Sequence, residues 1–278
     1  MTILEFSLLV WVCSFSAGFV GALTGLGGGV VIVPLLTAMF GVDIRYAVGA
    51  SLVSVIATSL GAASTYIKQG LTNWRLGMFL EVATTIGALV GAFMATIVSV
   101  KALSLVLAIV LIYSALVSQQ SPPKDLANKV SNPLAESLKL HGAYPTSEGI
   151  KSYQVNFVLP GFGVMLTAGV ISGLLGIGSG AFKVLAMDRV MGIPFKVSTT
   201  TSNFMIGVTA AASAGVYLAR GYIDPGLSMP VILGVLPGAF LGAKVLLGTK
   251  TQVLRIVFSL VLVAMAFKII YNSLAGEV

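Results

Sequence analysis

Charged side chains are scarce in this chain of 278 residues. Asp, Glu, Lys and Arg together make up 9% of it, whereas a water-soluble domain usually carries about 25%. Hydrophobic residues make up 57%, and the mean hydropathy is +1.02. Stretches with almost no charge recur, for example at 6–42 and 76–100, and they are long enough to cross a lipid bilayer. This composition excludes an ordinary water-soluble domain and indicates a multi-pass membrane protein.

Cysteine and histidine each occur once, as Cys13 and His141. Counting therefore excludes a disulfide framework and a Cys/His metal site. No P-loop or GxGxxG pattern points to a nucleotide, and no nucleophile is paired with a base. We therefore expect no enzyme activity, no metal and no cofactor. The net charge of +7 is attributed to cytoplasmic loops rather than to a nucleic-acid partner.

The apolar residues fall into ten segments, at 5–24, 29–40, 46–66, 77–99, 102–118, 155–175, 179–191, 197–218, 227–247 and 253–273. The second and the seventh are too short to cross about 30 Å of hydrocarbon as helices. Each of them follows a glycine cluster. Residues 119–154 are polar and proline-containing, so we expect a solvated cytoplasmic linker, a flexible tether with at most one short helix near "PLAESLKL".

The two halves of the chain repeat one another. A shift of 151 positions, without gaps, places "GLGGG" at 25–29 on "GIGSG" at 176–180. The same shift matches Ser51 with Ser202, Thr58 with Thr209 and Tyr66 with Tyr217. Five segments in each half would invert the second copy in the membrane. We therefore predict an all-α integral membrane protein with two inverted-topology repeats, 1–118 and 155–278, joined by the linker 119–154.

The distribution of cations predicts the orientation. If all ten segments cross, eleven Lys and Arg residues lie on the side of the linker and four on the other; if the two short segments turn back, the numbers become eight and seven. Because cytoplasmic loops are enriched in Lys and Arg, the first arrangement is favoured. It predicts a protein of the cell (cytoplasmic) membrane with a cytoplasmic linker and with both termini outside.

The glycine clusters indicate breaks in membrane helices. Glycine accepts left-handed backbone and leaves its amides accessible, and the helix that starts after a break presents unpaired N–H groups that attract anions. We therefore predict substrate contacts at Gly25, Gly27, Gly28, Gly29, Gly176, Gly178, Ser179 and Gly180. The alternative is close helix packing through GxxxG spacings. We favour that alternative for "GALVG" at 87–91 and "GAFLG" at 238–242.

Lys183 and Glu81 are the charged candidates for function within the membrane segments. Lys183 either contacts an anionic substrate, because a buried ammonium is costly and usually functional, or it snorkels to an interface or pairs with Asp188. Glu81 is the candidate for proton coupling, although an interfacial position near Arg75 is slightly favoured. The adjacent charges of Asp188 and Arg189 are expected in solvent at the end of the short segment.

Polar residues cluster in "VSTTTSNF" at 197–204. Hydroxyl and amide groups bind oxyanions without the desolvation cost of a full charge. This favours a substrate lining from Thr200, Thr201, Ser202 and Asn203, joined by Ser51 as the repeat partner of Ser202. Helix capping and hydrogen bonds between helices are the alternative.

"LTGLGGGVVIVPLL" at 23–36, "SGLLGIGSGAFKVL" at 172–185 and "STTTSNF" at 198–204 resemble the TauE/SafE sulfite exporter family over nearly the whole chain apart from the linker. The resemblance implies a transporter, often an exporter, of small sulfur-containing anions such as sulfite, thiosulfate or organosulfonates. It carries the glycine-rich motif over to 25–29 and 176–180, with Ser179 standing where the first copy has Gly28.

These observations together predict a secondary transporter that works by alternating access. The expected partners are a small anionic substrate, the lipid bilayer and, as a further hypothesis, protons. The alternative is a passive channel for small anions or neutral solutes. The oligomeric state and the direction of transport stay open.

Overall fold

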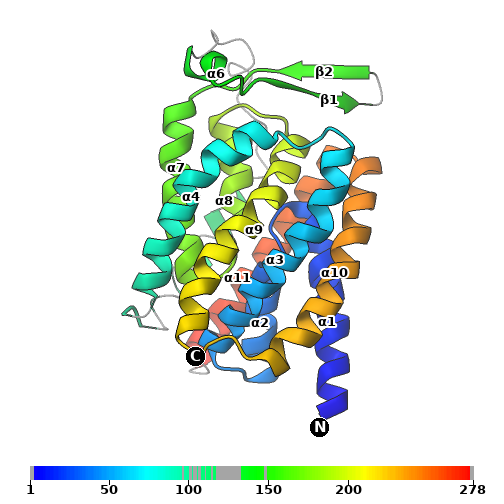
Figure 1. Cartoon of the computed structure of the whole chain (residues 1–278). Helices are drawn as coiled ribbons and strands as arrows, with labels where there is room; N and C mark the ends of the chain where they lie inside the picture. The colour runs from blue at the N-terminus through cyan, green and yellow to red at the C-terminus, as the bar shows by residue number, and fades with distance from the viewer. Residues whose placement is uncertain are drawn as a thin grey trace.

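The chain forms a helical bundle topped by a small hairpin in the computed structural model (Figure 1). The structure describes residues 3–95, 97–99, 102, 105, 108, 109, 111–113, 115, 116, 133–146 and 149–275. The helices are α1 (Ile3–Thr24), α2 (Gly29–Phe40), α3 (Ile44–Lys68), α4 (Trp74–Met94), α6 (Pro133–Ser137), α7 (Val158–Leu175), α8 (Gly180–Leu185), α9 (Phe195–Ala219), α10 (Pro225–Gly248) and α11 (Thr251–Ala275). A π-helical turn, η2 (Ala186–Val190), extends α8, and strands β1 (Gly142–Thr146) and β2 (Gly149–Tyr153) form the hairpin. The predicted segment 102–118 lies only partly within the described residues.

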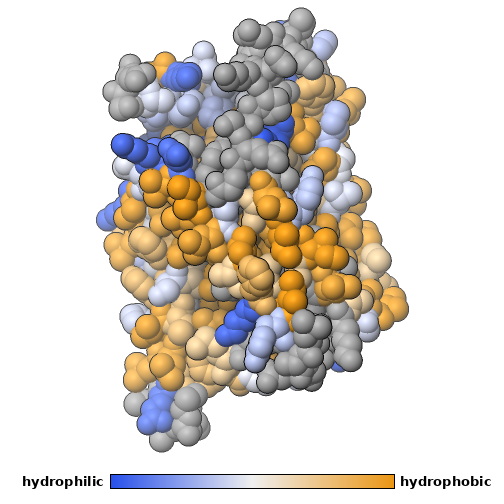
Figure 2. Space-filling model, turned by 180° about the vertical axis from the view of Figure 1, so that it is seen from behind, coloured by the Kyte–Doolittle hydropathy of each residue, from blue (hydrophilic) through white to orange (hydrophobic). Residues whose placement is uncertain are grey.

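Six helices of the described part of the chain are long and apolar enough to cross a membrane: α1, α3, α4, α7, α9 and α10. Their outer faces are rich in large apolar side chains, such as Leu60, Phe93 and Leu159, with 68%, 62% and 69% of their surface exposed. Figure 2 shows a broad apolar band across the middle of one face. Exposed apolar surface of this extent suits lipid rather than water. The predicted all-α, multi-pass membrane fold is thereby confirmed.

The helix bounds recur along the chain. Helices α2, α3 and α4 begin at residues 29, 44 and 74, and α8, α9 and α10 begin 151 positions later, at 180, 195 and 225. Helix α3 begins at the end of the molecule opposite the hairpin, whereas α9 begins near the hairpin, so the two run in opposite directions (Figure 1). Helix α1 packs on α10, α4 on α7 and α3 on α9. These features support the inverted repeat, which remains a prediction.

The GxxxG spacings at 87–91 and 238–242 mediate close packing between helices. A methyl group added at Gly91 of α4 would overlap the carbonyl of Val170 on α7. A methyl group at Gly238 of α10 would overlap the carbonyl of Phe15 on α1 in the same way. Only glycine allows the two backbones to approach so closely. The packing interpretation of these two motifs is confirmed.

The described part of the linker is folded, which differs from the predicted flexible tether. The expected short helix is present as α6, and the following residues pair as the hairpin β1–β2. Leu140 and Val155 are buried in a cluster with side chains of α4 and α9. The Nδ2 of Asn73, just before α4, donates to the Leu140 carbonyl at 2.8 Å and to the Tyr153 hydroxyl at 3.0 Å. Burial raises the pKa of Tyr153 to about 12, so its hydroxyl stays neutral at physiological pH.

Candidate functional site

Each glycine cluster separates two consecutive helices. Between α1 and α2, Gly25 and Gly27 have φ of 76° and 69°, and between α7 and α8, Gly176 and Gly178 have φ of 65° and 73°. Glycine adopts this left-handed backbone without the strain that a Cβ brings. Ser179 also adopts it, with φ of 52°, whereas its repeat partner Gly28 does not. The predicted breaks are confirmed, and the two are similar but not equivalent.

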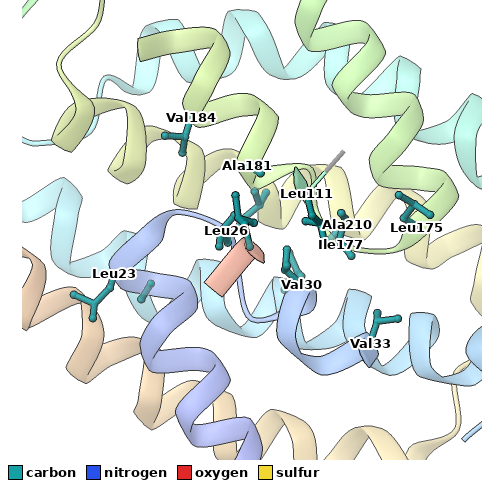
Figure 3. Close-up of a cluster of buried hydrophobic side chains, with 14 of the residues drawn as sticks. Leu23, Leu26, Val30, Val33, Leu111, Leu175, Ile177, Ala181, Val184 and Ala210 are labelled. Carbon is teal, nitrogen blue, oxygen red and sulfur yellow. The ribbon is translucent and has the colours of Figure 1, made fainter. Parts of the chain in front are cut away.

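The two breaks meet in the interior of the protein. All residues of 25–30 and 176–181 are buried. Figure 3 shows Leu26 of the first break beside Ala181, and Val30 beside Ile177 of the second. A methyl group on Gly180 would overlap the Gly25 carbonyl. The start of α8 is therefore held against the break after α1, and Gly29 at the start of α2 lies beside the Gly176 carbonyl after α7.

Two serine hydroxyls connect the breaks across the halves. The Ser51 Oγ of α3 lies 3.2 Å from the carbonyl oxygen of Gly29 and 2.8 Å from that of Gly176. The Ser202 Oγ of α9 lies 2.9 Å from the carbonyl oxygen of Gly25 and 3.4 Å from that of Gly180. Both hydroxyls are fully buried. Each serine thus contacts the break of its own half and the break of the other half.

Polar groups surround the first turns of α2 and α8. The Gly28 amide donates to the Thr58 hydroxyl at 3.3 Å. Among the described residues, the buried hydroxyls of Ser54, Ser179 and Thr199 have no hydrogen-bond partner. Ser54 Oγ lies beside the Gly28 backbone. A helix also leaves its first N–H groups without intrahelical partners, so donors without acceptors collect near the breaks.

A buried ion pair lies one turn beyond the second break. The Lys183 Nζ of α8 is 3.0 Å from the Glu81 Oε2 of α4, and the two side chains are 0% and 5% exposed. The Thr209 hydroxyl of α9 accepts from Lys183 and donates to Glu81. Lys183 therefore neither snorkels nor pairs with Asp188, and the favoured interfacial position of Glu81 is wrong. This ion pair could not be predicted from the sequence, because its partners are 102 residues apart.

Asp188 also differs from the expectation. Its side chain is 1% exposed and lies 3.7 Å from the Arg189 Nε. The two charges belong to η2, whose inner side is covered by the cluster that contains Met187 and Val197. Burial of a charge requires a partner, so this pair is shielded rather than solvated.

The polar side chains of "STTTSNF" contact different parts of the protein. Thr200 donates to the Leu71 carbonyl at 2.9 Å, and Thr201 accepts from the Asn73 amide at 3.0 Å, so both hold the connection between α3 and α4. The Asn203 Nδ2 donates to the Ala22 carbonyl at 2.8 Å, at the end of α1. Only Ser202 contacts the breaks through its side chain. In this conformation the structure joins Ser51, Ser202 and the two clusters, but not Thr200 and Thr201.

Thr209, Thr84 and Thr85 are the polar contacts of the ion pair that no sequence argument selected. The Thr84 hydroxyl donates to the Glu81 Oε2 at 2.9 Å. One signal for Thr209 was available, since it matches Thr58 at the shift of 151 positions. For Thr84, the spacing of three residues from Glu81 places both on one helix face.

The comparisons with known proteins agree on one family. The profile of the family described as "Sulfite exporter TauE/SafE" matches residues 10–269. "Probable membrane transporter protein YunE" of Bacillus subtilis is 27% identical over 278 residues, or 98% of this chain and 99% of that protein. YdhB of the same organism, with the same description, is 25% identical and covers 85% of this chain and 89% of its own.

A protein of another organism is similar over nearly the same length. "Probable membrane transporter protein MJ0441" of Methanocaldococcus jannaschii is 25% identical over 267 residues, or 91% of each chain. No solved structure matches. The glycine-broken helices lie within the matched range, as do the six apolar helices, except for the first residues of α1. The chain belongs to the sulfite exporter TauE/SafE family.

Proposed function

We propose that this membrane transporter is a secondary transporter that exports small sulfur-containing anions such as sulfite, thiosulfate or organosulfonates. The meeting of the two glycine breaks around Ser51 and Ser202 carries the proposal. The name of the matched family supplies the substrate class. The relatives' description as membrane transporters agrees with it.

The substrate anion binds between the first turns of α2 and α8. Helix N-termini favour negative charge, and the buried hydroxyls of Ser54 and Ser179 have no other partner among the described residues. The fully buried Lys183 adds a positive charge one turn further on. Small oxyanions suit this combination, because several donors and one cation match their oxygens and charge.

Alternating access results from rocking of residues 1–118 against residues 155–278, around the packed pair α3 and α9. The hydrogen bonds from Ser51 to Gly176 and from Ser202 to Gly25 cross between the two halves. Because each serine also lies near a carbonyl of its own half, these two hydrogen bonds can exchange as the halves move. Proton coupling operates through Glu81, whose carboxylate faces Lys183 across the same boundary.

The test uses purified protein and proteoliposomes. Sulfite, thiosulfate, sulfate, sulfoacetate and taurine are screened for thermal stabilisation, and uptake of the best ligand is followed under an imposed proton gradient. We expect one or more sulfur anions to stabilise the protein, to saturate uptake and to accumulate against a gradient. Lys183→Ala should lose the stabilisation. Uptake without saturation or accumulation would identify a passive channel, and the absence of any stabilising anion would overturn the substrate assignment.

A further inference from the structure

The geometry points to a role for Glu81 as an internal substitute for the substrate: its carboxylate occupies an oxyanion site that the transported anion takes over. This inference rests on the proposed function and specifies its charge exchange. The evidence is the set of groups around the carboxylate. Lys183 and three threonine hydroxyls, those of Thr84, Thr85 and Thr209, all donate toward it directly.

This donor set is what a small oxyanion requires. Oε2 accepts from Lys183 at 3.0 Å and from Thr84 at 2.9 Å, and Oε1 accepts from Thr85 at 3.3 Å and from Thr209. An ammonium and several hydroxyls bind a sulfonate or sulfite through the same charge-assisted hydrogen bonds. The carboxylate and such an anion therefore compete for the same donors.

The donor set adjoins the glycine break. The Lys183 amide donates to the Ser179 carbonyl at 3.0 Å, inside the second break. Thr209 lies seven residues after Ser202 on α9, two turns or about 10 Å along the same helix face, and Ser202 contacts both breaks. An anion that leaves the first turns of α2 and α8 thus meets the Lys183 ammonium, held by Thr209, about two helical turns further along α9.

The Glu81 carboxylate and its four donors come from both halves of the chain. Glu81, Thr84 and Thr85 belong to α4, whereas Lys183 and Thr209 belong to α8 and α9. A movement between the halves separates Glu81 from Lys183 and would leave two buried charges without partners, which is strongly unfavourable. A monoanion that pairs with Lys183 removes one of these charges, and a proton from water that binds the Glu81 carboxylate removes the other. Anion and proton enter together, and the net charge of the site does not change.

Few other titratable groups face the pair. Among the described residues, helix α7 carries no titratable side chain. The other elements around the ion pair carry Arg75 on α4, Asp188 and Arg189 on η2, and Lys196 and Tyr217 on α9. Asp188 and Arg189 lie close to each other. Arg75 and Lys196 lie in the first turns of their helices, and Tyr217 in the last turn of α9. Glu81 is accordingly the group expected to take up the proton.

The experiment measures anion affinity and proton uptake together. Methanesulfonate and ethanesulfonate are the probes, since both are monoanions that do not titrate near neutral pH. Binding to the purified protein is measured by calorimetry between pH 6 and pH 8, and proton uptake with an indicator dye in weak buffer. We expect the wild type to take up a proton with the bound anion, and to bind more weakly as the pH rises.

Glu81→Gln removes the competing carboxylate. It should tighten binding at least about tenfold, as expected for a close charge pair, and abolish both the proton uptake and the pH dependence. Glu136→Gln, a matched change of an exposed residue on α6, should behave as the wild type. The double variant Glu81→Gln/Lys183→Gln keeps a neutral hydrogen-bonding pair for folding, and it should not bind the anions.

The outcomes separate this inference from the proposed function. Anion binding that Glu81→Gln leaves unchanged or weakens, or wild-type binding without proton uptake, would overturn the role of Glu81 while the transporter assignment stands. Failure of both probes to bind wild type and Glu81→Gln alike would count against the anion site itself.

Discussion

Thr58 and Thr209 occupy matching positions, 151 residues apart, yet they bind different groups. The Thr58 hydroxyl accepts from the Gly28 amide at 3.3 Å, at the start of α2. The Thr209 hydroxyl connects Lys183 and Glu81 instead. The difference arises because the charged residues are not repeated: Ile32 stands at the position that matches Lys183, and Ile232 at the position that matches Glu81. Lys183, the cation of the proposed anion pathway, therefore has no charged counterpart at the matching position of the first half.

The paired threonines give a matched prediction. Thr209→Val keeps the side-chain shape but removes two hydrogen bonds to charged groups, which should lower the free energy of unfolding by about 3 kcal/mol and strongly reduce transport. Thr58→Val removes two neutral hydrogen bonds, one from the Gly28 amide and one to the Ser54 carbonyl, and should cost about 1–2 kcal/mol. Thermal unfolding in detergent and uptake into proteoliposomes measure both. Equal losses in the two variants would argue against a special role of Thr209.

The ion pair should show strong coupling in a double-mutant cycle. Lys183→Met or Glu81→Met alone leaves a buried charge without its partner and should cost about 3–5 kcal/mol. The double variant Lys183→Met/Glu81→Met has no buried charge at this site, so it should recover most of that stability and still fail to transport. The measurement is thermal unfolding of the four proteins in the same detergent. Additive losses would contradict a direct interaction.

Two glycines of α7 differ sharply in their surroundings. A methyl group at Gly173 would overlap the Ala88 carbonyl of α4, whereas one at Gly163 meets no atom within 4 Å. We expect Gly173→Ala to separate the helices and to lower the melting temperature by several degrees, since an overpacked contact costs about 1–3 kcal/mol. Gly163→Ala should be neutral or slightly stabilising, because alanine is the better helix former. Similar melting temperatures of the two variants would contradict the close contact of α4 and α7.

Asn73 anchors the hairpin to the membrane helices. Its Oδ1 accepts from the Leu76 amide at 3.1 Å and caps α4, while its Nδ2 donates to Leu140 and Tyr153. Asn73→Asp keeps the cap but loses the Nδ2 donor, and Asn73→Ala loses both, at a cost of about 1 kcal/mol for the cap alone. We expect faster proteolysis of the hairpin in both variants, and a lower melting temperature of the helices chiefly in Asn73→Ala.

The predicted orientation can be tested by labelling. In a variant without Cys13, a cysteine introduced at Ile150, which is 83% exposed on β2, should react with an impermeant thiol reagent only in opened cells. A cysteine at residue 2 should react in intact cells. Figure 1 places the start of α1 at the end of the molecule opposite the hairpin, in agreement with opposite sides. Protection of residue 2 in intact cells would reverse the topology.

The positions of the helices could be predicted from the pattern of apolar residues in the sequence. Runs of apolar residues bounded by glycine, proline and polar residues predict segments such as 29–40, and α2 has these same bounds. The breaks at 25–29 and 176–180 could also be predicted, because left-handed backbone within a membrane helix depends on local residue type more than on packing. Their recurrence at one spacing indicated that they belong together.

The partners of the polar residues depended on the tertiary structure. Nothing near Lys183 in the chain indicates that it lies 3.0 Å from Glu81, because a buried charge is stabilised by whichever opposite charge the fold brings to it. Likewise, "STTTSNF" is one polar run, but helix geometry turns Thr200 toward Leu71 and Ser202 toward Gly25. The membrane helices and their breaks follow from local chemistry, so the order of the amino acids is enough to predict them. Only the packing of the two halves decided which charges and hydroxyls meet between them.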